Sequence, residues 1–216
     1  KGRVAELAKL VPAAAKVLIL VGGASAEKTG TLAEVRAALG ERQHATFSGI
    51  EPNPSFETSM KAVDQVRSGG FDFLLAVGGG SVIDAVKLIA APVHFEGDAW
   101  AILEKRGRNI TQAVPFGAVL TLPATGSEMN NGSVITHRGK GAKLAFSSVH
   151  TYPLFSVLDP TKTYTLPPQQ LANGVVDAFV HTVEQYLTYP VSAPVQDRFA
   201  EGILQTLIEE GPKALA

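Results

Sequence analysis

Three consecutive glycines follow directly on an apolar run in the segment 74–87, LLAVGGGSVIDAVK. An apolar pattern with helical spacing begins immediately after them. The segment predicts a buried parallel strand, a tight turn and a helix. Glycines let the backbone approach a ligand closely, and the free N–H groups in the first turn of a helix attract an anion such as a pyrophosphate. A tight turn that binds nothing is the alternative for these residues taken alone.

A second unit of the same kind lies near the start of the chain. The apolar run 16–21, KVLILV, ends in Gly22 and Gly23, and helical spacing covers residues 31–39. The spaced G-x-G-x-x-G fingerprint is absent. Ser25 and Lys28 follow the turn, and a small hydroxyl with a cation suits a 2′-phosphate, which favours NADP over NAD. A solvated Lys28 is the alternative, and the sequence leaves the direction of Glu27 open.

Strand and helix patterns alternate through the first three quarters of the chain. Further strands are predicted at 44–47, 73–77, 116–122 and 156–158, with helices at 55–68 and 82–91 and a hairpin from 133–136 and 143–145. This alternation predicts an α/β fold with an open, mostly parallel sheet, in which ligands bind at the carboxyl ends of the strands. The segment 94–112, which includes Trp100 and the basic stretch 105–108, is predicted to lie on the surface.

Polar side chains follow several of the predicted strands. Asn53 stands between two prolines that stiffen its loop, so it is a candidate ligand contact or part of a plain turn. Thr121 and Thr125 offer hydroxyl groups at the end of the strand 116–122. Asp84 stands three residues before Lys87 on the predicted helix, where it either pairs with that lysine or faces the ligand cleft.

The pattern changes near Pro167, where helical spacing continues without strands. We expect two domains, an α/β domain at 1–162 and the beginning of an α-helical metal-binding domain at 163–216. Asp177 and His181 are four residues apart on one predicted helical face, and their oxygen and nitrogen atoms suit zinc or ferrous iron. A surface hydrogen bond is the alternative. Apolar neighbours favour a buried pair, and a buried carboxylate requires a partner or a metal.

The other histidines do not supply an obvious third ligand. His44, His94 and His137 are expected to be exposed, and His150 is a candidate neighbour of the pair. Because the chain begins with Lys1 and stops at Ala216 inside a helical pattern, we expect a fragment whose remaining ligands lie beyond its end.

Composition excludes several classes of partner. The 216 residues carry a net charge of −1 with no long run of one sign, so nothing favours nucleic acid. No apolar run reaches the about 18 residues of a membrane span, so we expect no membrane partner. Cysteine is absent, which fits a reducing, cytoplasmic compartment.

Two stretches resemble the iron-dependent (group III) alcohol dehydrogenase family. The glycines at 78–80 with Ser81, Asp84 and Lys87 resemble its cofactor loop, and 156–184 resembles its metal-site signature. GIEPNP at 49–54 and NGVVDAFVHTVE at 173–184 are similar to the branch of NADPH-dependent aldehyde reductases and butanol dehydrogenases. Ala24 departs from that branch, which often has another glycine there.

The resemblance implies a cofactor, a metal and a reaction. It implies hydride transfer between NADP(H) and small aldehydes or primary alcohols, with one divalent metal (zinc or iron) held in part by Asp177 and His181, which would be the catalytic residues, and a homodimer. The implied cofactor contacts are Gly22, Gly23, Ser25, Asn53, Gly78, Gly79, Gly80, Ser81, Asp84, Thr121, Thr125, Ser127 and Lys143. A metal- and NAD-using lyase or cyclase of the dehydroquinate-synthase type and a non-catalytic nucleotide-binding fragment are the alternatives.

Overall fold

A computed structural model describes residues 1–189 and 192–215 of the chain. The chain divides into two compact units, Lys1–Tyr164 and Thr165–Ala216, and each is described here by itself. Among the described residues, no helix is both long and apolar enough to cross a lipid bilayer.

The first unit is built on a parallel sheet of five strands, which confirms the predicted fold class. The strands are β1 (Val17–Val21), β2 (His44–Phe47), β3 (Phe73–Gly79), β4 (Phe116–Leu122) and β7 (Ser156–Val157). Their order across the sheet is β2-β1-β3-β4-β7, and every neighbouring pair is parallel. The chain therefore moves from β1 to one side, and then returns to form β3 on the other side of β1.

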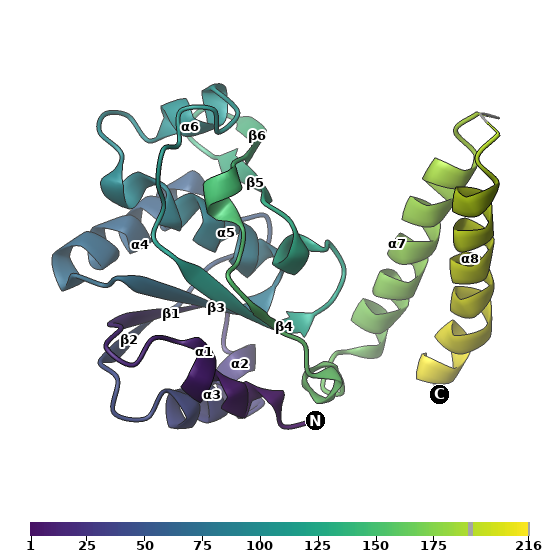
Figure 1. The fold of residues 1–216 in the computed structure, drawn as a ribbon, viewed down its shortest axis with the longest axis horizontal. Helices are drawn as coiled ribbons and strands as arrows, with labels where there is room; N and C mark the ends of the chain where they lie inside the picture. The colour runs from purple at the N-terminus through teal and green to yellow at the C-terminus, as the bar shows by residue number, and fades with distance from the viewer. Residues whose placement is uncertain (190–191, 216) are drawn as a thin grey trace. The chain divides into compact units, whose positions relative to one another are not determined.

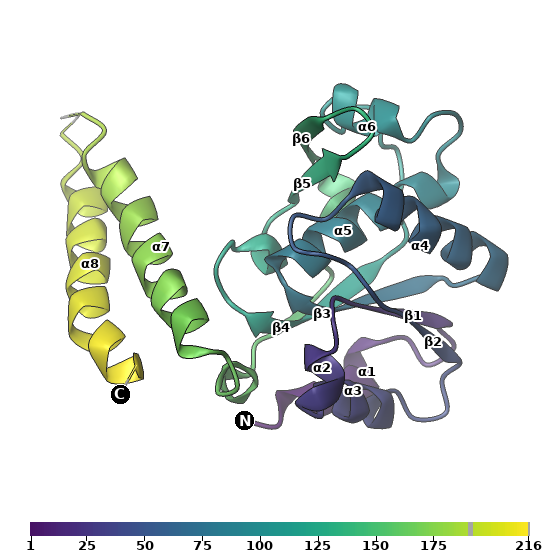
Figure 2. The same ribbon diagram turned by 180° about the vertical axis from the view of Figure 1, so that it is seen from behind.

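Helices cover both faces of this sheet (Figures 1 and 2). One face carries the 3₁₀ helix η1 (Arg3–Glu6) with α1 (Leu7–Leu10), α2 (Ser25–Lys28) and α3 (Thr31–Leu39), and the other carries α4 (Phe56–Gly69) and α5 (Gly80–Ala90). Side chains alternate along the strands, so Ile19 and Leu75 pack with the first group while Leu18 and Leu74 pack with the second. All four are fully buried, as expected for a parallel sheet covered on both sides.

Strand β3 continues directly into helix α5. The sequence predicted a turn at 78–80 and a helix from 82, but Gly78 and Gly79 belong to the strand and the helix begins at Gly80. The reason is close packing, because a Cβ atom on Gly78 would lie 2.6 Å from the side chain of Val82. Glycine here removes a clash between the strand and the first turn of the helix.

The antiparallel hairpin is present as predicted, with β5 (Gly132–His137) paired to β6 (Ala142–Ser147). The prediction that 94–112 lies on the surface was wrong for its apolar residues. Trp100, at the start of α6 (Trp100–Glu104), is 2% exposed in a separate core cluster formed with the hairpin and α5. The charged residues around Trp100 made the average hydropathy of the segment low, so the sequence indicated an exposed segment. The hairpin supplies the apolar surface that buries Trp100.

The prediction that His137 is exposed was also wrong. Its ring stacks on Phe56 at a centroid distance of 5.0 Å and meets the edge of Trp100 at 4.8 Å. The Nδ1 atom of His137 lies 2.8 Å from a carboxylate oxygen of Glu57 on α4. This histidine therefore closes the cluster between α4, α6 and the hairpin.

Short 3₁₀ helices make up the remaining elements of the first unit. These are η2 (Pro92–His94), η3 (Ser127–Met129), η4 (Val149–Thr151) and η5 (Pro160–Thr163). Just before η5, the carboxylate of Asp159 accepts hydrogen bonds from the backbone N–H of Arg3 and from both the N–H and the hydroxyl of Thr161. This buried carboxylate ties the start of the chain to the last strand.

The second unit is a pair of helices that lie side by side, α7 (Pro168–Tyr186) and α8 (Pro194–Leu215) (Figures 1 and 2). They approach closely at Gly211, where a Cβ atom would lie 2.7 Å from a methyl group of Val175. Apolar side chains elsewhere on the pair are exposed, among them Val176 at 60% and Phe199 at 69%.

Candidate nucleotide-binding site

The two glycine segments lie at the carboxyl edge of the sheet. Val21 and Val77 are register partners in β1 and β3, so the turn at Gly22 begins level with Gly78, one residue before β3 ends. A Cβ atom on Gly22 would lie 3.1 Å from the carbonyl oxygen of Ile50 and 3.5 Å from a methyl group of Val82 on α5. In sheets of this strand order the chain reverses its direction of progress between β1 and β3, and the crevice at that point is where ligands bind.

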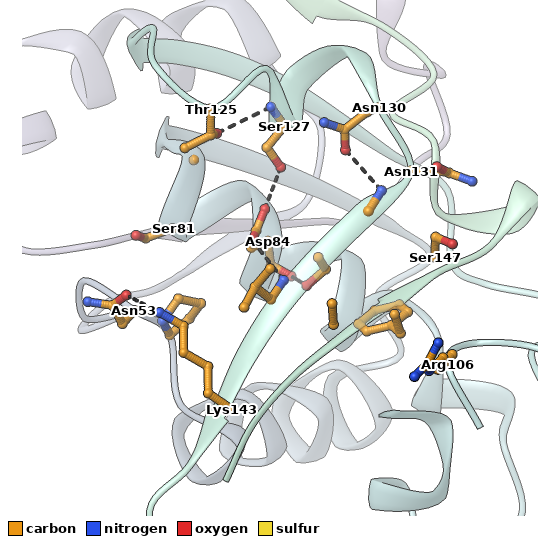
Figure 3. A pocket seen from close by; sticks show the side chains of 17 residues that line it. Asn53, Ser81, Asp84, Arg106, Thr125, Ser127, Asn130, Asn131, Lys143 and Ser147 are labelled. Carbon is orange, nitrogen blue, oxygen red and sulfur yellow. Dashed lines mark hydrogen bonds between the residues drawn. The ribbon is translucent and has the colours of Figure 1, made fainter. Parts of the chain in front are cut away.

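A cavity of about 700 Å³ opens beside the first turn of α5 (Figure 3). Its lining includes most of the polar residues that the sequence singled out on this side, namely Asn53, Gly80, Ser81, Asp84, Thr125, Ser127 and Lys143. The first N–H groups of a helix have no partner within the helix, and α5 presents them at this cavity. The arrangement suits a ligand with anionic groups and several hydroxyls.

Asp84 lies in the wall of the cavity and organises the loop that follows β4. One of its carboxylate oxygens accepts a 2.5 Å hydrogen bond from the hydroxyl of Ser127, and the other accepts from the backbone N–H of Val134 at 2.9 Å (Figure 3). Of the two alternatives for Asp84, a direct ion pair with Lys87 does not occur among the described residues, whereas Asp84 does line the cavity.

Lys87 lies fully buried behind this wall. Its ammonium group donates to the carbonyl and hydroxyl oxygens of Ser127 at 2.7 and 2.8 Å, to the amide oxygen of Asn130 at 3.0 Å and to the carbonyl oxygen of Gly132 at 2.7 Å. Because an ammonium group has three hydrogens, one of them is shared. Burial lowers the pKa of Lys87 to about 8, against the opposing effect of Asp84 and Glu128.

Asn53 and Lys143 hold the opposite side of the cavity together. The ammonium group of Lys143 on β6 donates to the side-chain oxygen of Asn53 at 2.9 Å (Figure 3). Asn53 has a φ of 53°, a left-handed conformation that asparagine tolerates better than most residues. The stiff loop predicted from the two flanking prolines thus presents this side chain at the cavity.

A smaller cavity of about 420 Å³ lies at the carboxyl ends of β1 and β2. Gly22, Gly23, Ser48 and Gly49 line it together with the apolar side chains of Val21, Ala24 and Leu32. Glu27 also lines this cavity, so its side chain points toward the ends of β1 and β2, a direction that the sequence left open. The carboxylate of Glu27 accepts hydrogen bonds from Arg36 on α3 at 3.3 and 3.4 Å.

Some expected contacts lie outside both cavities. Gly78 and Gly79 are strand residues, Thr121 is near the end of β4, and Ser25 begins α2 in an exposed position. None of these four residues is in the lining of either cavity. The structure therefore brings the Gly80 end of the triplet to the larger cavity and uses the preceding glycines for packing.

The Asp177–His181 pair is on α7, with a carboxylate oxygen of Asp177 3.5 Å from Nε2 of His181. The expectation that the pair is buried was wrong for the chain as described, because the side chains are 50% and 64% exposed. In the second unit α7 packs only against α8, which leaves this face open. Within the described residues, no three His, Cys, Asp or Glu side chains gather as a metal-binding group.

The larger cavity also contains residues that the sequence did not single out. Arg106 and Ser147 line its far end, and Asn130, Asn131 and Val134 line the wall that Asp84 and Lys87 support. The Asn-Asn pair continues the polar loop that starts at Thr125, and Asn is typical of turns. The sequence could therefore have indicated these two residues as part of the same loop. Arg106 had no such signal, because it lies 22 residues after Asp84 in a basic stretch typical of solvated surface.

These features define the class of protein as an α/β domain with two cavities that flank the β1/β3 switch point, the position at which sheets of this strand order bind ligands. The chain belongs to the iron-containing alcohol dehydrogenase family, whose model matches residues 1–160. This membership confirms the resemblance found in the sequence. The five-stranded parallel domain is the nucleotide-binding-type domain that members of this family carry at their N-terminal end.

Named relatives extend the comparison over the whole chain. It is 58% identical to the NADPH-dependent aldehyde reductase YqhD of Escherichia coli (strain K12), covering 100% of this chain and 56% of the relative. It is 45% identical to the probable NADH-dependent butanol dehydrogenase 2 of Bacillus subtilis (strain 168), with the same coverage. The chain thus spans about half the length of the curated relatives it matches.

Solved structures agree with this placement. A crystal structure of E. coli YqhD matches with a TM-score of 0.95 and covers 100% of this chain and 56% of its own. The structure of NADH-dependent butanol dehydrogenase A from Thermotoga maritima matches with a TM-score of 0.91 at 33% identity, covering 99% and 54%.

Proposed function

We propose that the protein carrying this chain is a metal-dependent alcohol dehydrogenase or aldehyde reductase that transfers a hydride between NADP(H) and small aldehydes or primary alcohols. The observation that carries the proposal is the start of α5, which opens into a cavity lined mostly by polar side chains, with a second cavity at the glycine turn after β1. Membership of the family and 58% identity to an NADPH-dependent aldehyde reductase support the same reaction.

The residues of the crevice fit a dinucleotide. A Cβ atom on Gly80 would lie 2.2 Å from the hydroxyl oxygen of Thr125, so glycine lets the loop after β4 approach the start of α5 closely at the cavity. The first N–H groups of α5 would receive the pyrophosphate, while Asp84 and the paired Asn53 and Lys143 would orient the ribose and ring beyond it. The smaller, apolar-walled cavity would take the adenosine half.

The donor atoms of Asp177 and His181 fit zinc or iron, and they would supply part of a four-ligand site. A metal bound there acts as a Lewis acid on the carbonyl oxygen of the aldehyde. The chain's own part is to hold the nicotinamide and to exclude water at the cavity wall fixed by Asp84, Ser127 and Lys87. A homodimer and a cytoplasmic location belong to the proposal, the latter supported by the absence of cysteine.

Titration separates this function from the alternatives. The complete protein is titrated with NADPH and with NADH, with and without zinc or iron, and turnover is then followed with a short-chain aldehyde. We expect nucleotide binding without added metal, and turnover only with metal. Nucleotide binding with no turnover of any aldehyde under any metal condition would favour a non-catalytic nucleotide-binding protein instead.

A further inference from the structure

The choice between NADH and NADPH depends on what lies beside the adenosine ribose, and the relatives of this chain are named for both nucleotides. The two nucleotides differ only in a phosphate on the 2′-oxygen. A carboxylate near that oxygen accepts a hydrogen bond from the 2′-hydroxyl of NADH and repels the phosphate of NADPH, whereas a cation does the reverse. The side chains that line the smaller cavity are therefore the ones that can distinguish NADH from NADPH.

The smaller cavity suits the adenosine half of a dinucleotide for two reasons. Val21, Ala24 and Leu32 give it apolar walls for an adenine ring, whereas polar side chains dominate the larger cavity. Gly22 and Gly23 place no side chain between the end of β1 and the cavity. Because Gly22 also lies against Val82 in the first turn of α5, a chain of phosphates at that helix start leads directly to this cavity.

Glu27 is the acidic residue in the lining of this cavity. Its side chain is 59% exposed and is held by Arg36, whose guanidinium also donates to the hydroxyl of Thr46 on β2 at 3.3 Å. Arg36 thus spans from α3 to β2 and keeps the carboxylate at the rim. The pair therefore places one charge of each sign at the cavity that would take the adenosine half.

We propose that Glu27 sets the nucleotide preference of this protein, lowering the affinity for NADPH so that NADH is also used, and that Arg36 limits this effect. The proposal rests on the proposed function, because it assigns a role within the same cleft. It modifies the preference for NADP that Ser25 and Lys28 favour, since Glu27 lines the cavity whereas Ser25 and Lys28 are not in its lining.

The test is a comparison of Glu27→Gln with the unmodified complete protein, by titration calorimetry with NADPH, NADH, adenosine 2′,5′-bisphosphate and AMP. Removing the charge while keeping the shape should lower the ratio of the NADPH to the NADH dissociation constant by about fivefold, the size of one unit-charge interaction across about 4 Å of water. The bisphosphate-to-AMP ratio should fall in parallel, which reports the adenosine end without any catalytic turnover.

Two further variants sharpen the result. Arg36→Gln should raise the same ratio, because Glu27 then acts without its counter-charge. Glu41→Gln removes an equal charge just before β2, at the amino edge of the sheet and outside the cavity lining, and should leave the ratio unchanged. Unchanged ratios in both Glu27→Gln and Arg36→Gln would overturn the proposal, whereas failure of the unmodified protein to bind either nucleotide would instead refute the proposed function.

Discussion

The ammonium nitrogen of Lys87 lies 2.8 Å from the hydroxyl oxygen of Ser127, and that hydroxyl in turn donates to Asp84 at 2.5 Å. A fully buried cation therefore supports a carboxylate in the cavity wall through one shared serine. The remaining bonds of Lys87, to Asn130 and Gly132, fasten the rest of the same loop. The wall of the larger cavity therefore depends on a charge that is fully buried behind it.

Lys87 should make stability rise with pH. Because its pKa is about 8 in the folded protein and near 10.5 when unfolded, the unfolded chain binds more protons between these values. The free energy of unfolding should therefore rise by about 3 kcal/mol from pH 8 to 10.5 on account of this residue. Urea denaturation across that range is the measurement, comparing the unmodified protein with Lys87→Met, which should lack this rise. Lys9→Met, at a mostly exposed lysine, serves as the control and should keep it.

Gly80→Ala should weaken nucleotide binding. The new methyl group would lie 2.2 Å from the hydroxyl oxygen of Thr125 and 2.9 Å from its methyl group, so the loop must move into or away from the cavity. We expect the dissociation constant for NADPH to rise about tenfold, equivalent to a loss of about 1.4 kcal/mol. Adding Thr125→Ala removes both close atoms and should restore part of the affinity.

The matched control for Gly80→Ala is Gly202→Ala on α8, where a Cβ atom would have nothing within 4 Å. That change should leave nucleotide binding alone and stabilise its helix by up to about 1 kcal/mol. Equal NADPH affinity in Gly80→Ala and the unmodified protein would contradict a role for this turn.

Asp177→Ala should remove the bound metal and the aldehyde reductase activity of the complete protein. A carboxylate oxygen is a strong ligand for zinc or iron, and alanine offers no replacement. Metal content per chain is measured by mass spectrometry of the purified protein, alongside NADPH affinity, which should not change because all the proposed nucleotide contacts belong to the first unit. Glu209→Ala, an exposed acidic position on α8, should retain its metal. Retention of metal and activity in Asp177→Ala would refute the assignment.

Asp159 should contribute stability that disappears in acid. The backbone N–H of Arg3 and the two groups of Thr161 hold the pKa of its carboxyl well below the usual 3.8. A lowered folded pKa gives stability that is present above the unfolded pKa and lost as the pH falls toward the folded one. The difference in unfolding free energy between the unmodified protein and Asp159→Asn should be constant from pH 7 to about 5 and shrink below about 4.

The control for this pH series is Asp64→Asn, at an exposed position on α4. Its unfolding free energy should follow that of the unmodified protein across the whole range. A gap for Asp159→Asn that stays the same size down to pH 2 would mean that its carboxylate is not the stabilising group.

The sheet and its helices were predictable because their signals are local. Continuous apolar runs such as 17–21 and 116–122 have the length and composition of buried parallel strands, and both were placed to within one residue. The hairpin was predicted from two short runs, 133–136 and 143–145, joined through the glycine-containing segment 138–141. The cavity lined by Gly80, Ser81 and Asp84 lies where the rule that ligands bind at the carboxyl ends of parallel strands predicts one.

What the sequence could not show depends on contacts between distant segments. Trp100 and His137 are 37 positions apart, and only their packing around Phe56 explains why neither is on the surface. The helical spacing of Asp84 and Lys87 predicts that they pair, yet the hydrogen-bond acceptors of Lys87 are 40 to 45 residues away in the sequence. The direction of Glu27 likewise depends on Arg36, one helix further on.

The direct passage from β3 into α5 has a mechanical consequence. With no loop between Gly79 and Gly80, the helix start has no freedom of its own and inherits its position from the pairing of β3 with β1. A slip of one residue in that pairing would carry the helix amides about 3.3 Å, well beyond the tolerance of a hydrogen bond. The pairing of the strands therefore fixes the position of the cavity beside α5, and fully buried core residues such as Leu75, which line neither cavity, contribute to that position.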